Sequence, residues 1–291
     1  MNAPRRLPGR LFPGLGFPAP AYRKIAAAML AAIVAVWGTA VAEAPTAAAT
    51  AHHPVYHGSR NDRVVALTFD DGWSVSATAR IFEILQRRGV SATFFPYAMA
   101  VTRAPWLWRE IAAAGYPIGD HTKNHPDLTQ LPAWRVKAEL DTARTIVEGI
   151  TGRAMVRVFR PPFGARNTAV DSDAASAGFA TDVLWDVDAG DASLGSDWAT
   201  VFWHAIRGGN GSIVLMHAGP AVTPTALDAV ISNYQARGFR FVTIPELLGD
   251  TGAPWPGQTG QAPVPGGGTV PGGGTGPCGR MPASGAVPRP L

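Results

Sequence analysis

Cysteine is almost absent from this chain of 291 residues, and the single one is Cys278. One cysteine excludes a disulfide within the chain and a cysteine-rich metal site. Any metal ion must therefore be bound by histidine and carboxylate side chains. Cys278 itself lies among glycine and proline residues, where we expect an exposed thiol without a partner.

Acidic residues are absent from the first 42 residues, which hold five of the 25 basic residues. The rest of the chain has 20 basic and 21 acidic residues, so its net charge is −1 instead of the +4 of the whole sequence. A basic surface that binds nucleic acid is therefore not expected.

An apolar run from Ile25 to Val41 follows these basic residues and ends at the small residues before Glu43. This order is typical of a secretory signal peptide, residues 1–42, that is cleaved after Ala42. The alternative is an uncleaved membrane anchor, because the run is close to the shortest that spans a bilayer. Both alternatives predict a secreted or cell-surface protein that meets the membrane only through this segment, and we expect a monomer.

The two ends of the remaining chain differ in composition from its middle. Residues 249–291 are rich in glycine, proline and threonine, which cannot bury enough apolar surface to offset the entropy of ordering, so a disordered tail is predicted. Residues 43–59 are predicted to be a linker with solvated histidines. A single domain, residues 60–248, remains, and the chain's 46% of apolar residues is enough for a sizeable core.

Strand-like runs alternate with amphipathic helical stretches throughout this domain. The expected strands are 64–69, 92–97, 116–119, 155–159, 180–187, 212–216 and 239–244, and the expected helices are 74–89, 105–115, 132–149, 167–178, 197–207 and 225–237. About seven β/α units in sequence favour an α/β fold with a parallel sheet, and their number suggests closure into a barrel. A doubly wound open sheet is the alternative.

The polar residues suited to chemistry fall where the expected strands stop. They are Asp70, Asp71, His121, Arg160, Asp188 and His217. In a β/α barrel these positions share one rim, so residues far apart in the sequence converge on one cleft.

A metal site is indicated by two of these segments. His121 and His125 are four residues apart, a spacing that brings two imidazoles together on one face of a helical turn. Two histidines and one carboxylate match a hydrolytic zinc site, and Asp71 is the natural third ligand. Its neighbour Asp70 would then remain free to move protons.

Five short motifs follow one another at fixed places in the domain. They are TFDDG at 68–72, HTKNH at 121–125, RPPFG at 160–164, WDVDAGD at 185–191 and IVLMH at 213–217. In content and order they resemble the polysaccharide deacetylase family (NodB homology, carbohydrate esterase family 4) over about residues 63–248. The resemblance implies a distorted (β/α)7 barrel that removes acetyl groups from glycans containing N-acetylglucosamine or N-acetylmuramic acid, such as peptidoglycan or chitin-type oligosaccharides.

The resemblance also implies roles for single residues. Asp71, His121 and His125 would bind one divalent metal ion, which is zinc, with cobalt and manganese as alternatives. Asp70 would be the general base that takes a proton from the attacking water. Arg160 would keep Asp70 ionised and oriented.

The other residues carried over belong to the acid and to the substrate pocket. His217 would be the general acid, with Asp191 paired to it and raising its pKa. Leu215 would line the pocket for the acetyl methyl group. Pro161 would contact the substrate, and the backbone N–H of Phe163, where the family commonly has tyrosine, would stabilise the oxyanion.

One departure from the family pattern is Ala192, which stands where tryptophan is usual. Loss of that ring would widen or reshape one wall of the acetyl pocket, and it keeps open the alternative of a catalytically impaired glycan-binding protein. An O-acetyl esterase acting on xylan, which would share the metal chemistry, is a further alternative. Trp73, Trp106 and Trp134 could stack on sugar rings, but we expect most of them to pack into the core.

Overall fold

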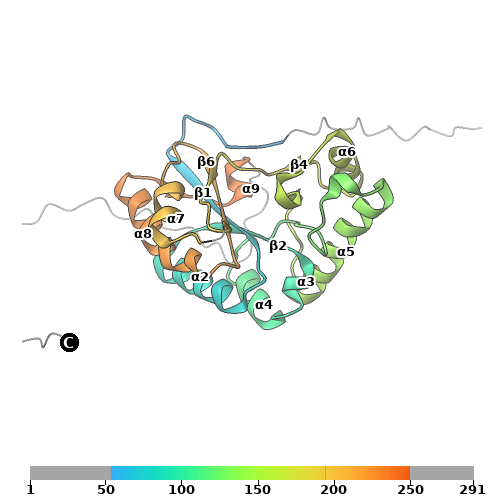
Figure 1. Cartoon of the computed structure of the whole chain (residues 1–291), viewed down its shortest axis with the longest axis horizontal. Helices are drawn as coiled ribbons and strands as arrows, with labels where there is room; N and C mark the ends of the chain where they lie inside the picture. The colour runs from blue at the N-terminus through green and yellow to red at the C-terminus, as the bar shows by residue number, and fades with distance from the viewer. Residues whose placement is uncertain (1–53, 194, 250–291) are drawn as a thin grey trace, which may run out of the picture. The chain divides into compact units, whose positions relative to one another are not determined.

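The computed structural model describes residues 54–193 and 195–249 (Figure 1). The strands are β1 (Val64–Asp71), β2 (Ala92–Pro96), β3 (Val158–Phe159), β4 (Thr181–Asp182), β5 (Val187–Asp188), β6 (Ser212–His217) and β7 (Arg240–Phe241). The α-helices are α2 (Val75–Arg88), α3 (Ala98–Val101), α4 (Pro105–Ala113), α5 (Ala133–Thr151), α6 (Thr168–Ser176), α7 (Trp198–Ala205), α8 (Val222–Ala236) and α9 (Ile244–Leu247). The predicted signal segment, Cys278 and the predicted tail from residue 250 lie outside the described residues.

Strand β1 is the centre of the sheet, and each of its eight residues is buried. It pairs in parallel with β2, β6 and β7, and β6 pairs in parallel with β5. A continuous run of apolar residues, as in 64–69, is expected for a strand that has neighbours on both edges and packing on both faces.

Single β-bridges continue the parallel arrangement from β2 to β4. Ile118 bridges Phe94 of β2, Asp120 bridges Phe159 of β3, and β3 pairs with β4. The chain between β4 and β5 then returns to the β6 edge, where the Asp186 amide donates to the Ile213 carbonyl. The prediction of a distorted (β/α)7 barrel is confirmed.

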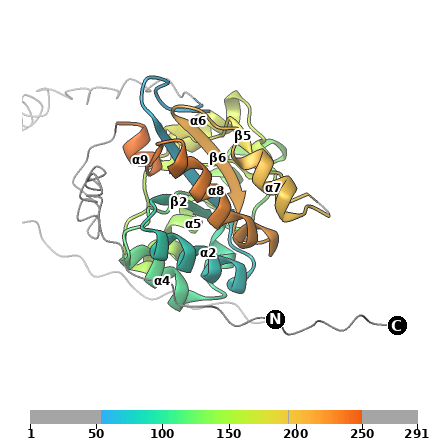
Figure 2. The same ribbon diagram turned by 90° about the vertical axis from the view of Figure 1, so that its left-hand side faces the viewer.

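The helices cover the outside of the strands, as Figure 2 shows for α2, α7 and α8. The larger core cluster joins the outward side chains of β1, such as Leu67, to Ile81 of α2 and Val230 of α8. A second cluster includes the alternate β1 residues Val64 and Ala66 and fills the interior between the strands. Alternation along β1 therefore assigns successive side chains to opposite faces.

Two expected strands are shorter than predicted. Residues 116–119 form only isolated bridges, because Pro117 has no N–H to donate to a ladder. The expected strand 180–187 is split into β4 and β5. The buried Arg160 side chain binds the carbonyls of Val183 and Leu184 there, so these carbonyls accept from a guanidinium instead of a neighbouring strand.

The chain joins the fold earlier than residue 60. Val55 bridges Val183 and His57 bridges Ser212, although the sequence assigned both to a linker. Among the described residues, no helix has the length and hydropathy needed to cross a bilayer.

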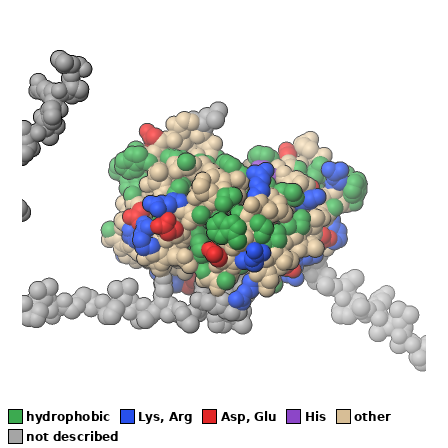
Figure 3. Space-filling model, turned by 90° about the horizontal axis from the view of Figure 1, so that it is seen from below, with side chains coloured by type: hydrophobic (Ala, Val, Ile, Leu, Met, Phe, Trp, Pro, Cys, Tyr) green, Lys and Arg blue, Asp and Glu red, His purple; other side chains and the backbone are tan. Residues whose placement is uncertain are grey.

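The three tryptophans expected mainly in the core are at the surface, so that expectation is wrong. Trp73 is 40% exposed, Trp106 50% and Trp134 67%. Figure 3 looks at the face that carries α2, α3 and α4, where hydrophobic side chains gather between charged ones, and the described residues of these helices expose Met99 and Trp106. For Trp106 and Trp134, helical periodicity could not separate exposed positions from core ones, because exposure depends on which elements pack against each helix.

Candidate metal centre and acid–base site

The two adjacent carboxylates at the end of β1 point in different directions. Asp70 continues the alternation of Val64 and Ala66 and so faces the barrel interior. Asp71 has φ 73°, a left-handed conformation that turns its side chain to the rim. Gly72 continues the turn with φ 82° in close contact with Trp108, where an added Cβ would lie 2.6 Å from the indole.

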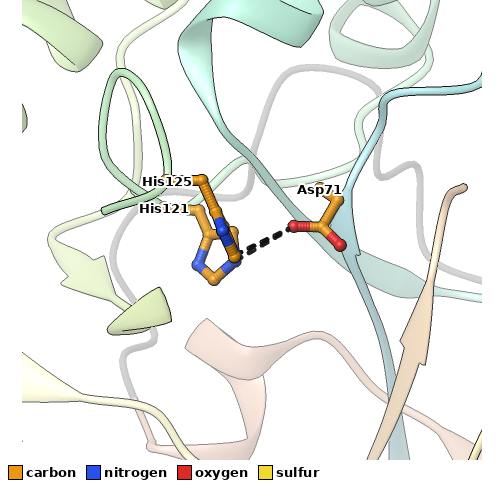
Figure 4. A group of neighbouring side chains, drawn as sticks. All are labelled: Asp71, His121 and His125. Carbon is orange, nitrogen blue, oxygen red and sulfur yellow. Dashed lines mark ion pairs between the residues drawn. The ribbon is translucent and has the colours of Figure 1, made fainter. Parts of the chain in front are cut away.

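Asp71, His121 and His125 come together as predicted, and Figure 4 shows the two imidazoles facing the Asp71 carboxylate. Asp71 Oδ1 lies 3.4 Å from His121 Nε2 and 3.2 Å from His125 Nε2. One ligand atom from each residue lies within 4.8 Å of the others, and no other such group of His, Cys, Asp or Glu occurs in the described part of the chain.

This donor set fits a divalent cation. Ligand atoms at about 2.0–2.1 Å from a tetrahedral metal lie about 3.3 Å from one another, close to the two separations measured from Asp71 Oδ1. His121 Nδ1 hydrogen-bonds the Arg160 carbonyl at 2.7 Å, which fixes the tautomer that leaves Nε2 free to bind a metal.

The two histidines meet on a loop, so the prediction of a helical turn is wrong. Thr122 and His125 have φ of 70° and 63°, outside the right-handed helical region. The His125 amide donates to Thr122 Oγ1 at 2.9 Å and closes the loop. The Thr122 side chain therefore brings the two histidines together, which the sequence had attributed to helical spacing.

Glu139 of α5 binds the backbone of the same loop, and sequence reasoning missed it. Its carboxylate accepts from the Lys123 amide at 3.1 Å, from the Asn124 amide at 2.9 Å and from Asn124 Nδ2 at 2.8 Å. Glu139 is buried, and no pattern around it in the sequence connects it with the histidines.

The three ligand groups influence one another's protonation. Burial raises the pKa of Asp71, but its hydrogen bond with His121 and the charges of the histidines outweigh burial and lower the pKa. Burial lowers the pKa of His121, but the charge of Asp70 and the contact with Asp71 outweigh it and raise the pKa. Burial and the His121 charge lower the pKa of His125. Binding of a cation therefore competes with a proton at His121.

Arg160 is fully buried and is bonded to Asp70, as predicted. Its Nη1 donates to Asp70 Oδ1 at 2.7 Å and to Thr68 Oγ1 at 2.8 Å. The guanidinium also stacks on the rings of Phe95 at 4.4 Å and Trp185 at 5.6 Å. These contacts fix one Asp70 oxygen, while Oδ2 lies 3.9 Å from His121 Nε2 on the side of the metal site.

His217 lies beside Asp70, because the two residues are register partners of β6 and β1. Asp191 receives a 2.7 Å hydrogen bond from the His217 amide and pairs with His217 Nδ1 at 2.7 Å, and Thr223 Oγ1 donates to it at 2.6 Å. Burial opposes protonation of His217, but the Asp191 hydrogen bond and charge outweigh burial and raise its pKa to about 9. The predicted His217–Asp191 pair is present.

The predicted substrate residues surround these groups to different degrees. Phe163 is 70% exposed, and its ring lies 4.6 Å from that of His125. Pro161 is buried next to Arg160, and Leu215 is buried on β6 two residues before His217. The contacts of Pro161 and Leu215 with an acetyl group, and the oxyanion role of the Phe163 N–H, stay predictions.

Asp188 does not join the site, although it also ends a strand. It is exposed and accepts from the Gly190 amide. It lines a separate cleft of about 470 Å³ together with Arg60 and His204. The position at a strand end therefore correctly predicted that five of the six polar residues lie together at the rim. Asp188 is the exception.

Backbone strain is concentrated at the rim. In residues 54–193 and 195–249, the non-glycine residues with positive φ are Asp71, Thr122, His125 and Phe163. Such conformations cost about 1–3 kcal/mol each and persist where the surroundings impose them, often at functional sites. Two of the four are metal-ligand candidates and the other two are their direct neighbours in the loop and in space.

The fold and the site together define a β/α barrel with a cation site, a buried acid and a paired histidine at one rim, which is the architecture of a metal-dependent hydrolase. A family model described as polysaccharide deacetylase matches residues 57–181. The chain is 31% identical over 197 residues to a peptidoglycan-N-acetylglucosamine deacetylase of Bacillus cereus, an alignment that covers 65% of this chain and 89% of that protein. The chain belongs to the polysaccharide deacetylase family.

Two further likenesses show the range within the family. The chain is 30% identical over 196 residues to the peptidoglycan-N-acetylmuramic acid deacetylase PdaA of Bacillus subtilis, covering 66% of this chain and 74% of that one. It superposes with a TM-score of 0.63 on BA3943 of Bacillus anthracis, described as a family pseudoenzyme, at 29% identity and over 67% of this chain and 69% of that one. The family therefore includes both named deacetylases and a protein described as a pseudoenzyme.

Proposed function

We propose that this protein hydrolyses the acetamide groups of an N-acetylated glycan, a polymer of N-acetylglucosamine or N-acetylmuramic acid such as peptidoglycan or a chitin-type oligosaccharide. The observation that carries the proposal is the convergence at one rim of the Asp71, His121 and His125 triad, the Asp70–Arg160 pair and the His217–Asp191 pair.

The chain's own residues supply a base at the site. When bound to the triad, a divalent cation would polarise the acetamide carbonyl and make a water molecule more acidic. Asp70 Oδ2 faces this position, whereas Oδ1 is held by Arg160, so Oδ2 is the atom that takes the proton from the attacking water.

His217, the register partner of Asp70 on β6, is the acid that we assign. His217 has a pKa of about 9 and is therefore protonated at neutral pH. It donates its proton to the departing amine, while Asp191 holds the ring through Nδ1 and leaves Nε2 for the substrate. The Phe163 N–H is the backbone donor that we assign to the developing oxyanion.

Replacement of the base tests this assignment. In Asp70→Asn we expect acetate release from N-acetylglucosamine oligomers to fall at least about a thousandfold, because the amide cannot accept the proton. The variant should still bind one equivalent of metal, measured by elemental analysis after dialysis. Asp188→Asn, which changes a strand-end carboxylate outside the site, is the matched control and should keep its activity. Undiminished turnover by Asp70→Asn would disprove the role of Asp70.

Zinc is the metal that we propose, because two imidazoles and one carboxylate with an open position suit a catalytic zinc site. Cobalt and manganese are the alternatives, and activity of the metal-free protein reconstituted with each ion separates the three. We also propose that the protein acts outside the cytoplasm as a monomer. A mature chain that starts at Glu43, found by N-terminal sequencing of exported protein, supports cleavage over anchoring.

A catalytically impaired glycan-binding protein is the second candidate. It is favoured by the exposed Ala192 beside Asp191 and by the likeness to a pseudoenzyme. Turnover of any N-acetyl glycan that stops with a chelator and returns with zinc rejects it. An O-acetyl esterase would share the metal chemistry, and acetate release from acetylated xylan compared with N-acetylglucosamine oligomers distinguishes the two.

A further inference from the structure

A cleft of about 450 Å³ opens directly beside the metal-ligand triad. Two of the ligands, Asp71 and His125, form part of its wall. Trp73 and Asn124 extend the wall along the same two segments, and one other segment, around α3, adds Tyr97, Met99 and Arg103. A group bound in this cleft lies next to the reacting acetamide, and the volume is within the range of small-molecule sites.

Trp73 connects the segment that follows the metal-ligand candidate Asp71 with the segment that follows His217. It follows Gly72 in the chain, and its indole packs on Gly219, two residues after His217. A Cβ added to Gly219 would lie 2.2 Å from the indole, so only glycine allows this contact. The indole is also 40% exposed, which leaves apolar ring surface for a sugar to stack on.

Arg103 is the cation of the same cleft. It follows α3, is exposed, and its side chain has no ion pair or hydrogen bond with any residue that the structure describes. The arginines of α2 differ in this respect, since Arg80 and Arg87 each pair with a carboxylate. Asp71 is the one carboxylate in the wall of the cleft, and it serves the metal site. The charged side chain of the cleft that remains available to a ligand is therefore the Arg103 guanidinium, which is positive.

These observations specify the chemistry of a ligand. It has a sugar ring that stacks on Trp73 and an anionic group that pairs with Arg103. A guanidinium binds a planar carboxylate through two parallel hydrogen bonds, which neutral sugar hydroxyls cannot reproduce. Neutral chitin-type glycans have sugar rings but no carboxylate. Glycans that contain muramic acid have sugar rings and also a carboxylate, which its lactyl ether carries.

We propose that this cleft is a glycan subsite in which Trp73 stacks on a sugar and Arg103 selects a carboxylate carried by that sugar. The inference rests on the proposed function, which it deepens: the preferred substrate is an acidic N-acetyl glycan instead of a neutral one.

Binding and turnover of three glycans test the subsite. They are an N-acetylglucosamine oligomer, an oligomer of alternating N-acetylglucosamine and N-acetylmuramic acid, and the methyl ester of the second. The wild-type protein should prefer the free acid. In Arg103→Gln we expect the ratio of kcat/KM for the acid to that for the neutral oligomer to fall roughly tenfold, mainly through KM, which is the size of one charge-assisted pair.

Controls separate recognition from folding. Arg109→Gln removes an exposed arginine of α4 outside the cleft wall and should leave the preference unchanged, and Arg103→Lys should keep part of it. Trp73→Ala should raise KM for all three glycans and Trp73→Phe should restore most of the loss. Trp134→Ala, which removes an exposed tryptophan of α5 outside the cleft wall, should change nothing.

A binding measurement makes the test independent of turnover. The dissociation constants of the same three glycans are measured with the metal-loaded Asp70→Asn variant. A preference for the acid that disappears in Asp70→Asn/Arg103→Gln supports the subsite. Equal affinity for acid, ester and neutral oligomer, or a preference that Arg103→Gln leaves intact, overturns it even if the protein is an active deacetylase. If the wild type releases acetate from none of the glycans, the proposed function is overturned. The measured affinities for acid, ester and neutral oligomer still decide whether the subsite exists.

Discussion

At the residue scale, the site depends on two neighbouring aspartates with different surroundings. Asp70 is held by a buried guanidinium inside the barrel, and Asp71 is turned by a positive φ toward two imidazoles. Two ionised carboxylates so close together would repel each other, and separate cationic partners remove that conflict. These different surroundings underlie the proposed roles, in which Asp70 moves protons and Asp71 binds the metal.

With His217 as the proposed general acid, the His217–Asp191 pair is expected to set the upper pH limit of the reaction. Since Asp191 is the main group that raises the pKa of His217 to about 9, the imidazolium persists below that pH and is lost above it. In Asp191→Asn we expect the alkaline limb of the kcat/KM profile to move down by more than about one pH unit, toward the ordinary histidine pKa of 6.5. The measurement is a pH–rate profile at saturating metal.

Asp197→Asn is the control for this profile. Asp197 caps α7 through the Thr200 amide and lies outside the site, so its replacement should leave the alkaline limb in place. An unchanged limb in Asp191→Asn would mean that another group donates the proton.

At the scale of elements, the metal-ligand loop is organised by the helix that follows it. The loop 121–125 has no regular hydrogen-bond ladder, and the carboxylate of Glu139 on α5 replaces one with three acceptor contacts. Removal of that carboxylate leaves loop amides without a partner, which costs free energy and allows His125 to move.

Replacement of Glu139 should therefore weaken metal binding. We expect Glu139→Ala to lower zinc affinity about tenfold or more, measured by competition with a chelator, and Glu139→Gln to have an intermediate effect because it keeps one acceptor. Glu148→Gln is the matched control: Glu148 also lies on α5 and accepts a backbone amide, from Met155, but it does not touch the loop. Equal zinc affinity in all three variants would assign Glu139 to folding alone.

At the scale of the whole molecule, the triad joins two distant parts of the barrel. Asp71 ends the central strand, whereas His121 and His125 follow the bridge between Asp120 and Phe159. A cation bound by all three has no equivalent in the unfolded chain, so metal binding adds directly to stability.

Metal removal should thus lower the melting temperature. At metal concentrations of about 100 times Kd the gain is about 2.7 kcal/mol, and for a domain of this size it raises Tm by about 5–10 °C. Differential scanning calorimetry with zinc and with a chelator measures the difference. Asp71→Asn should abolish the zinc-dependent increase in Tm, and Asp188→Asn should keep it. A wild-type Tm that does not respond to zinc would contradict a metal site at the triad.

Much of this architecture was predictable because it is encoded in local patterns. The apolar run before Asp70 predicted a strand buried on both faces, and β1 has that environment. Ser74 and Gly89 mark the ends of α2, where Ser74 Oγ accepts from the Ala77 amide and Gly89 adopts a left-handed conformation. Errors arose where one distant side chain changed the backbone, as Arg160 does between β4 and β5.

The sequence alone determined the order of β/α units, the strand ends and therefore the residues that meet at the rim, because periodicity and parallel topology are properties of the chain itself. Only the tertiary structure decided the loop that joins His121 to His125, the burial of Arg160, and the exposed cleft of Trp73 and Arg103. The reason is physical: each of these depends on contacts with residues such as Glu139, Asp70 and Gly219, whose distance in space is set by packing of the whole barrel and not by their separation along the chain.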